Sequence, residues 1–361
     1  MKKYKVCVYA IAKNEEKFVN KWCESMSEAD EVYVLDTGST DNTVELLKKN
    51  NVHVETKIIK PWRFDIARNE SLKMVPEDTD ICVCTDLDEV LNKGWRKILE
   101  ENWNKSLTRA YYTYNWSLDK NNNPIVSFYN EKIHTRNDYK WTHPVHEVLS
   151  YIGNDIEKST TIDNIILNHY PDYSKSRSNY LNLLEMSVKE DPTDDRNMHY
   201  LGREYMYYQK YDDAIKTLKK HLKLKTATWR DERCASLRFI GRCYTNLKDY
   251  KNARKYYKKA IMEAPYLRDS YVELALLEFE LGNYKQVEKY CLKALTIKSH
   301  QKTYINETFS WDNTIYDLLS ISCYHLNKID YALYFVDLAL QYTPSDQRLL
   351  NNRKIFKEKE D

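Results

Sequence analysis

Small residues recur at a spacing of 34 positions in the second half of this 361-residue chain. Gly241 is followed 34 residues later by Ala275, and aligned small residues lie at Gly202, 39 residues earlier, and Ser320, 79 residues later. Short side chains let the two helices of a pair approach closely, and each pair buries one face on the next. The period therefore predicts stacked helical pairs over residues 191–361, with insertions near 223–230 and 300–311. An irregular helical bundle is the alternative.

The first half follows another pattern, in which short apolar runs alternate with amphipathic segments. The expected strands are Tyr4–Ala12, Glu31–Asp36, Val52–Thr56 and Ile81–Asp86, and the expected helices are Glu15–Met26, Asp41–Asn50 and Asp65–Met74. This alternation predicts a parallel α/β sheet covered on both faces, with antiparallel additions over residues 107–170. We expect an α/β domain over residues 1–175, a linker helix over 176–190 and the helical domain over 191–361.

Composition excludes several classes of protein. The chain has six glycines, and none forms G-x-G-x-x-G or G-x-x-x-x-G-K-[ST], which excludes a dinucleotide-type Rossmann site and a P-loop. A formal charge of +2 is too balanced for binding nucleic acid by charge alone. Eight scattered cysteines without C-x-x-C indicate reduced thiols. The apolar run Val6–Ala12 is too short for a signal peptide or a membrane span, so we expect a cytoplasmic protein.

Three polar motifs stand at the carboxyl ends of expected parallel strands, the edge where open α/β sheets bind ligands. They are AIAKNEE at 10–16, LDTGSTDNT at 35–43 and TDLDE at 85–89. In the second motif, Gly38 permits a turn with positive φ, and the residues after it can cap the next helix. Capping explains the serine and threonines, but it does not explain why Asp36 ends the strand.

The third motif carries two acids, Asp86 and Asp88, on either side of Leu87. In an extended strand, carboxylates at i and i+2 point the same way. Like charges that close repel each other unless a cation lies between them, and Mg²⁺ or Mn²⁺ suits oxygen ligands. Such an ion bridges a diphosphate and neutralises the charge of a leaving group. A solvated acidic turn is the plainer alternative.

Four motifs follow one another in the chain: N-E-E, D-x-G-S-T-D, F-D-I-A-R-N (Phe64–Asn69) and D-L-D. With these motifs in this order, the chain resembles the family 2 glycosyltransferases of GT-A fold over about residues 4–170. The helical period resembles tetratricopeptide repeats, and the combination is similar to sublancin-type peptide S-glycosyltransferases. The resemblance implies that Ala12 and Glu15 border the base and ribose, and that Asp36 accepts a hydrogen bond from uracil N3–H. It implies that Arg68 faces the nucleotide, that Asp86 approaches the ribose and metal, and that Asp88 ligates the metal. Without its motif, a lone arginine on a helix is more often a surface charge.

After D-x-D the chain departs from the processive branch, because the E-D and Q-x-x-R-W motifs are absent and KWTHPVHEVL stands at 140–149. In the family the general base lies at about this point, which makes Glu147 our candidate and His146 the alternative. In the competing interpretation, Trp141, Pro144 and Val145 pack as a lid and Glu147 is a solvated charge.

His169 closes the expected strand IILNH (residues 165–169) and resembles the third metal ligand of the GT-A fold. Its imidazole favours Mn²⁺ over Mg²⁺. A satisfied buried histidine is the alternative, and His146 can exchange roles with it. Lys175 and Arg177 follow and are candidates for contacts to phosphate.

These expectations describe an inverting transfer of a sugar from a UDP-sugar, with Mn²⁺ or Mg²⁺, to a hydroxyl or thiol. The repeats would bind a peptide, protein or glycan acceptor, or pair two subunits as a homodimer; neither nucleic acid nor a membrane is an expected partner. A metal-dependent nucleotidyltransferase is a second hypothesis, although such enzymes usually carry a glycine-rich first loop and AIAKNEE has no glycine. A non-catalytic scaffold is a third.

Overall fold

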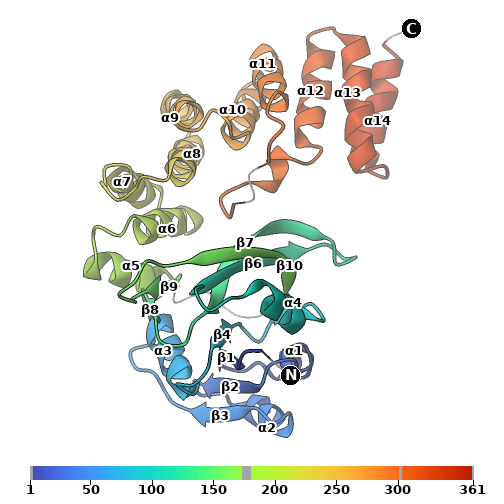
Figure 1. Cartoon of the computed structure of the whole chain (residues 1–361). Coiled ribbons are helices and arrows are strands. Elements are labelled where there is room, and N and C mark those ends of the chain that lie inside the picture. Colours follow the sequence, from blue (N-terminus) through green and yellow to red (C-terminus); the bar gives the residue numbers. More distant parts are fainter. Residues whose placement is uncertain (1–2, 173–179, 301–302, 360–361) are drawn as a thin grey trace. The chain divides into compact units, whose positions relative to one another are not determined.

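A computed structural model describes residues 3–172, 180–300 and 303–359, and the chain divides into two compact units, residues 1–187 and 188–361 (Figure 1). The division falls inside the segment 176–190 that the sequence analysis takes as a linker helix. Within that segment the structure has helix α5, Tyr180–Glu190. The two units are described separately below.

The first unit is built on a mixed sheet, in which eight described strands lie in the order β3-β2-β1-β4-β7-β6-β10-β5. Their bounds are β1 Val6–Ala12, β2 Glu31–Asp36, β3 His53–Thr56, β4 Ile81–Cys84, β5 Glu89–Leu91, β6 Arg109–Leu118, β7 Pro124–His134 and β10 Ser159–His169. Strands β1 to β4 pair in parallel, which confirms the predicted sheet. In the later region β7 is antiparallel to β4 and β6 as expected, but β10 runs parallel to β6.

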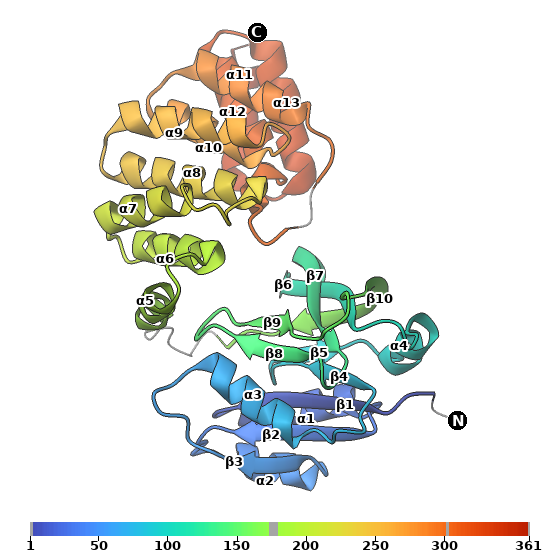
Figure 2. The ribbon, with the colours of Figure 1, turned by 60° about the vertical axis from the view of Figure 1, so that its left-hand side comes forward.

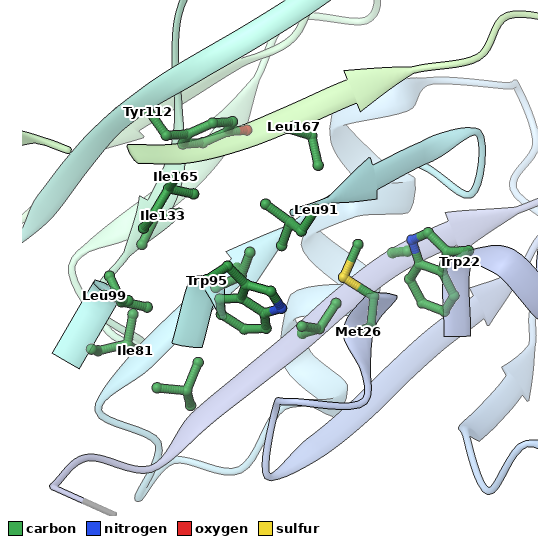
Figure 3. Close-up of a cluster of buried hydrophobic side chains, with 14 of the residues drawn as sticks. Trp22, Met26, Ile81, Leu91, Trp95, Leu99, Tyr112, Ile133, Ile165 and Leu167 are labelled. Atoms are coloured by element: carbon green, nitrogen blue, oxygen red, sulfur yellow. The ribbon is translucent and has the colours of Figure 1, made fainter. Parts of the chain in front are cut away.

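The two faces of β1 enter different cores. Val6 and Val8 join a cluster with helices α1 (Glu16–Met26), α2 (Thr43–Lys49) and α4 (Trp95–Asn102). Figure 3 shows this cluster, in which Trp22 and Trp95 lie among the residues of β5 and β10. Cys7 and Tyr9, one step along the strand, face helix α3 (Phe64–Met74) and a separate hairpin, β8 (Tyr139–Thr142) with β9 (Val148–Tyr151). The sheet is thus covered on both faces.

The second unit is a series of antiparallel helical pairs (Figure 2). The pairs are α6 (Asp195–Tyr207) with α7 (Tyr211–His221), α8 (Arg230–Asn246) with α9 (Tyr250–Glu263), α10 (Asp269–Glu280) with α11 (Tyr284–Leu295), and α12 (Thr314–His325) with α13 (Ile329–Tyr342), followed by α14 (Gln347–Lys357). A Cβ added to Gly241 would lie 2.6 Å from Tyr257 Cε1, and one added to Gly202 would lie 2.5 Å from Leu218 Cγ. The small residues therefore sit at the close helix contacts that the period predicts.

The two insertions expected from the repeat spacing fall between helices. One joins α7 to α8, and the other joins α11 to α12 and contains a 3-10 turn, η1 (Thr308–Ser310). In the part of the chain that the structure describes, no helix is long and apolar enough to span a membrane. All eight cysteines are free, as the sequence analysis predicted, and only Cys23 is more than marginally exposed.

Candidate functional site

The loops that follow β1 and β2 are joined to each other by hydrogen bonds. Thr37 donates to the Ala12 carbonyl from its backbone N–H at 2.8 Å and from its hydroxyl at 3.0 Å. The Glu15 N–H donates to Thr43 Oγ1 at 2.7 Å. These bonds hold Ala12, at the end of β1, and Glu15, just before α1, at the carboxyl edge of the sheet. The structure thus brings both residues to the edge at which we expected the nucleotide.

Asp36 is buried at the end of β2, and its carboxylate is used by the loop that follows. It accepts hydrogen bonds from the backbone N–H groups of Gly38 at 3.2 Å and Ser39 at 3.0 Å. Gly38 has φ of 106°, a left-handed conformation that favours glycine. Asp36 therefore stabilises this turn, which explains a strand-ending acid that capping did not explain. Its contact with uracil stays a prediction.

The D-x-D motif lies in a turn, and our expectation that it extends a strand was wrong. Strand β4 ends at Cys84, and the chain reverses before β5 begins at Glu89. Two bonds close this turn: the Asp86 N–H donates to Glu89 Oε2 at 2.8 Å, and the Glu89 N–H donates to the Asp86 carbonyl at 3.1 Å. Because the backbone turns here, Asp86 and Asp88 have different partners.

Asp86 is held by two cationic side chains. Arg68 Nη2 lies 2.8 Å from Asp86 Oδ1, and Lys132 Nζ lies 3.3 Å from Oδ2. Burial raises the pKa of Asp86, but Arg68 and Lys132 outweigh it and hold that pKa well below its usual range. The two cations therefore stabilise Asp86 as a carboxylate.

Arg68 is buried on α3 and links two candidate residues. Besides Asp86, it contacts Glu147, whose Oε1 lies 2.5 Å from Arg68 Nε, and its guanidinium lies 5.0 Å from the centre of the Trp141 ring. Burial lowers the pKa of Arg68, but the two carboxylates raise it well above its ordinary value. The alternative of a surface charge was thus wrong for Arg68.

Lys132 was missed by the sequence analysis. Its ammonium on β7 lies between Asp86 and the buried Glu89, whose Oε1 is 3.9 Å away. Tyr114 OH donates to the same Glu89 oxygen at 2.9 Å, and burial raises the pKa of Glu89. No local pattern marks Lys132, because β7 reaches this edge only through long-range pairing with β4, at Val83 and Ile133.

His169 ends β10 beside Asp88. Its Nε2 lies 3.4 Å from Asp88 Oδ2, its Nδ1 lies 2.9 Å from the Trp116 carbonyl oxygen, and its ring stacks on Trp116. Burial lowers the pKa of His169, but the hydrogen bonds to Asp88 and Trp116 outweigh it and raise the pKa. An oxygen and a nitrogen at this separation fit two ligands of one divalent ion. Asp86 does not complete a three-ligand group with them: in the described residues no such group within 4.8 Å forms here.

The segment proposed to carry the base forms the turn of the β8–β9 hairpin. Trp141 and Val145 are buried, and the Phe64 N–H donates to the Pro144 carbonyl, so this turn packs on α3 as the lid interpretation expects. Glu147 is nevertheless an ion-pair partner of Arg68 rather than a solvated charge. His146 has φ of 50° and its ring meets Tyr180 edge-on.

Lys175 and Arg177 lie outside the described residues.

Comparison with known families identifies both units. Residues 7–152 match the family described as Glycosyl transferase family 2, and residues 239–266 and 269–301 match the Tetratricopeptide repeat. The chain therefore carries a family 2 glycosyl transferase domain followed by an all-helical tetratricopeptide-repeat domain, which confirms the predicted fold class and resemblance.

Curated relatives share parts of this arrangement. The glycosyltransferase SunS, from the SPbeta prophage of Bacillus subtilis (strain 168), is 26% identical over 230 residues, covering 59% of this chain and 52% of SunS. Outer dynein arm-docking complex subunit 4 of Danio rerio is 32% identical over 144 residues, or 38% of this chain and 27% of that protein. This chain thus spans about half or less of the length of these relatives.

Solved structures of repeat proteins are also similar. The tetratricopeptide-repeat protein YrrB is 14% identical, with a TM-score of 0.40, and the match covers 49% of this chain and 83% of YrrB. The thermophilic repeat protein TTC0263 of Thermus thermophilus is 20% identical with a TM-score of 0.35, covering 49% of this chain and 88% of that protein.

Proposed function

We propose that the first unit transfers a sugar from a UDP-sugar to an acceptor hydroxyl or thiol, with Mn²⁺ or Mg²⁺ and inversion at the anomeric carbon. One observation carries the proposal: within the domain matched to family 2 glycosyl transferases, Asp36, Asp86 and Asp88 all stand at the carboxyl edge of β2 and β4. The family match favours sugar transfer over nucleotidyl transfer.

Asp88 and His169 would hold the divalent ion, since their facing atoms lie 3.4 Å apart. A bound ion supplies positive charge to the departing diphosphate. Arg68 and Lys132 supply two further cations at the same edge, and they are already oriented by Asp86. Fixed charges in a partly buried site stabilise developing negative charge without reorganising at the moment of reaction. The diphosphate therefore meets a site that is oriented before it binds.

Glu147 would accept the proton of the acceptor. A general base must point its accepting atom at the proton it takes, and the contact with Arg68 fixes the direction of the Glu147 carboxylate. His146, the preceding residue, stays the alternative base. The variant Glu147→Gln keeps the shape of the side chain but removes the proton acceptor and the charge paired with Arg68. If Glu147 is the base, this variant lowers kcat far more than it raises the KM for the donor. An unchanged rate in the Glu147→Gln variant would show that Glu147 is not the general base.

The repeats would bind a peptide or protein acceptor, or a second copy of the chain. We also propose a cytoplasmic location, because eight free cysteines suit a reducing compartment. Truncation after residue 187 tests acceptor binding: hydrolysis of the donor should persist, whereas transfer to the acceptor should fall.

The central experiment measures UDP release from a panel of radiolabelled UDP-sugars with Mn²⁺. We expect Asp88→Asn to lower turnover by at least about 100-fold, since even groups behind a metal ligand contribute up to that factor. Asp78→Asn, at an exposed acid paired with Lys5, is the matched control and should leave turnover unchanged. Absence of release with every donor in folded protein, or full activity of Asp88→Asn, would overturn the proposal. Turnover of nucleoside triphosphates would instead favour the nucleotidyltransferase.

A further inference from the structure

Three helix ends in the second unit place an imidazole and two carboxylates together. Asp195 is the first residue of α6, His221 the last of α7, and Glu232 the third of α8. One ligand atom from each lies within 4.8 Å of the other two. His221 and Glu232 are buried, and Asp195 is half-buried. None of these residues belongs to the site at the edge of the sheet.

Glu232 is a buried acid, and its two carboxylate oxygens face His221 and Tyr304. The second acid, Asp195, makes no side-chain hydrogen bond or ion pair within the residues that the structure describes. Two carboxylates this close repel each other unless a cation joins them.

All three residues of the cluster stand at helix ends, where the helix dipole acts on their side chains. Asp195 and Glu232 stand in the first turns of α6 and α8, where the helix dipole stabilises a negative charge. His221 stands at the end of α7, where the dipole stabilises a positive charge. The cluster therefore lies where the N-termini of α6 and α8 meet the C-terminus of α7.

Neighbouring side chains orient the imidazole and the buried acid. Ser236 Oγ lies 2.9 Å from His221 Nδ1, and Tyr304 OH donates to Glu232 Oε2 at 2.6 Å. These contacts leave His221 Nε2 and Glu232 Oε1 facing each other at 3.2 Å. Two ligands bound at about 2.0–2.1 Å in a tetrahedral site are separated by about this distance. Partners behind the ligands are typical of metal-binding histidines.

We propose that Asp195, His221 and Glu232 bind one divalent ion of the zinc class, with a solvent molecule as a further ligand. One imidazole and two carboxylates form a donor set that zinc accepts. The ion would join the first helical pair to the second, since its ligands come from α6, α7 and α8. The competing explanation is a purely hydrogen-bonded chain, in which His221 Nε2–H donates to Glu232, and it predicts no metal binding.

The test uses the full chain carrying Asp88→Asn, so that the site at the sheet edge contributes little. Chelator-treated protein is titrated with Zn²⁺ by calorimetry and with Co²⁺ by visible absorption. We expect one equivalent to bind and the melting temperature to rise with Zn²⁺. Adding Asp195→Asn should weaken binding at least about 10-fold. It should change the melting temperature of the metal-free protein only slightly, because the Asp195 side chain makes no bond to any residue that the structure describes and only its charge near the helix end is lost.

Two further variants make the result decisive. Glu232→Gln, which keeps a partner for Tyr304, should also weaken binding. Asp213→Asn, at an exposed acid on α7, should bind like its parent. The proposal fails if folded protein binds no stoichiometric Zn²⁺, or if Asp195→Asn and Asp213→Asn bind it equally. No sugar donor is present in this experiment, so its outcome is independent of the proposed transferase activity.

Discussion

Arg68 in the first unit and Arg238 in the second are both buried among carboxylates, but their surroundings differ. The Arg68 side chain is 4% exposed and pairs with Asp86, which is 34% exposed. The Arg238 side chain on α8 is 1% exposed and pairs with Glu273 on α10, which is 4% exposed. One charge cluster is thus open on one side, and the other is closed.

The difference follows from where the partners originate. Asp86 lies in the turn after β4 at the edge of the sheet, and Glu147 lies in the turn of the β8–β9 hairpin; their side chains are 34% and 12% exposed. Arg238 is enclosed by the next helical pair and by the segment between α11 and α12, where it donates to the Ile305 carbonyl at 2.8 Å and lies 3.3 Å from Glu307. The closed cluster serves stability, whereas the open one is suited to binding a charged substrate.

The largest loss of stability should follow removal of Arg238, the cation of the enclosed charge cluster. Arg238→Met leaves buried Glu273 with Arg242 alone, and breaking a buried pair costs about 3–5 kcal/mol. We expect about 3 kcal/mol, since Arg242 remains, measured as the free energy of unfolding in urea. Arg254→Met, which breaks the more exposed pair with Glu278, is the control and should cost about 1 kcal/mol or less. Equal losses would contradict the comparison.

The open cluster should respond mainly in activity. Arg68→Met removes the partner of Glu147, while Asp86 keeps Lys132, so we expect a stability loss of about 2 kcal/mol, smaller than for Arg238→Met. Loss of one oriented donor costs about 100-fold or more in rate, and we expect that fall in UDP release. Arg68→Lys keeps the charge but not the forked geometry and should restore little of it. An Arg68→Met enzyme with normal kcat would refute a role in the site.

Acid should weaken both units through one buried histidine each. Burial lowers the pKa of His134 in the first unit and of His199 in the second to about 3. In each histidine the folded pKa lies below the unfolded value of about 6.5. The neutral ring therefore stabilises the fold fully above about pH 6.5, and this stabilisation is lost as the pH falls from about 6.5 towards 3. We expect about 1–2 kcal/mol from each between pH 7.5 and pH 5.

Substitution separates the two histidines. His134→Gln and His199→Gln should each reduce the dependence of the unfolding free energy on pH over that range, and the double variant should reduce it further. The control is His325→Gln, at a histidine that stacks on Tyr284 near the surface, and it should leave the dependence unchanged. A pH profile unaltered by the first two variants would show that other groups control acid unfolding.

The smallest losses of stability should come from substituting two glycines, one required for its backbone conformation and the other for a close helix contact. Gly94 has φ of 84° and open space around it, so Gly94→Ala should cost about 1 kcal/mol through backbone strain. Gly241→Ala should cost about as much through its contact with Tyr257, since overpacking outweighs the gain in helix propensity. Tyr257→Leu relieves the contact with residue 241, so in urea the double variant with Gly241→Ala should lose less unfolding free energy than the sum of the two separate losses. The losses from Tyr257→Leu and Gly94→Ala should add in full.

Local patterns predicted the elements well and the site partly. The period of 34 located the helix contacts at Gly202 and Gly241, and the alternation of apolar runs located the strands that end at Ala12 and Asp36. The strand expected to run to Asp86 ended at Cys84, because the bonds between Asp86 and Glu89 close a turn that hydrophobic pattern does not encode.

Spacing in the chain by itself determined the two architectures, because strand and helix periods are properties of a few consecutive residues. Only the tertiary structure decided which charges meet: Lys132 reaches Asp86 across 46 positions, and Arg68 reaches Glu147 across 79. Strand pairing and the packing of the hairpin on α3 create these contacts, and such long-range contacts leave no periodic signal in the sequence.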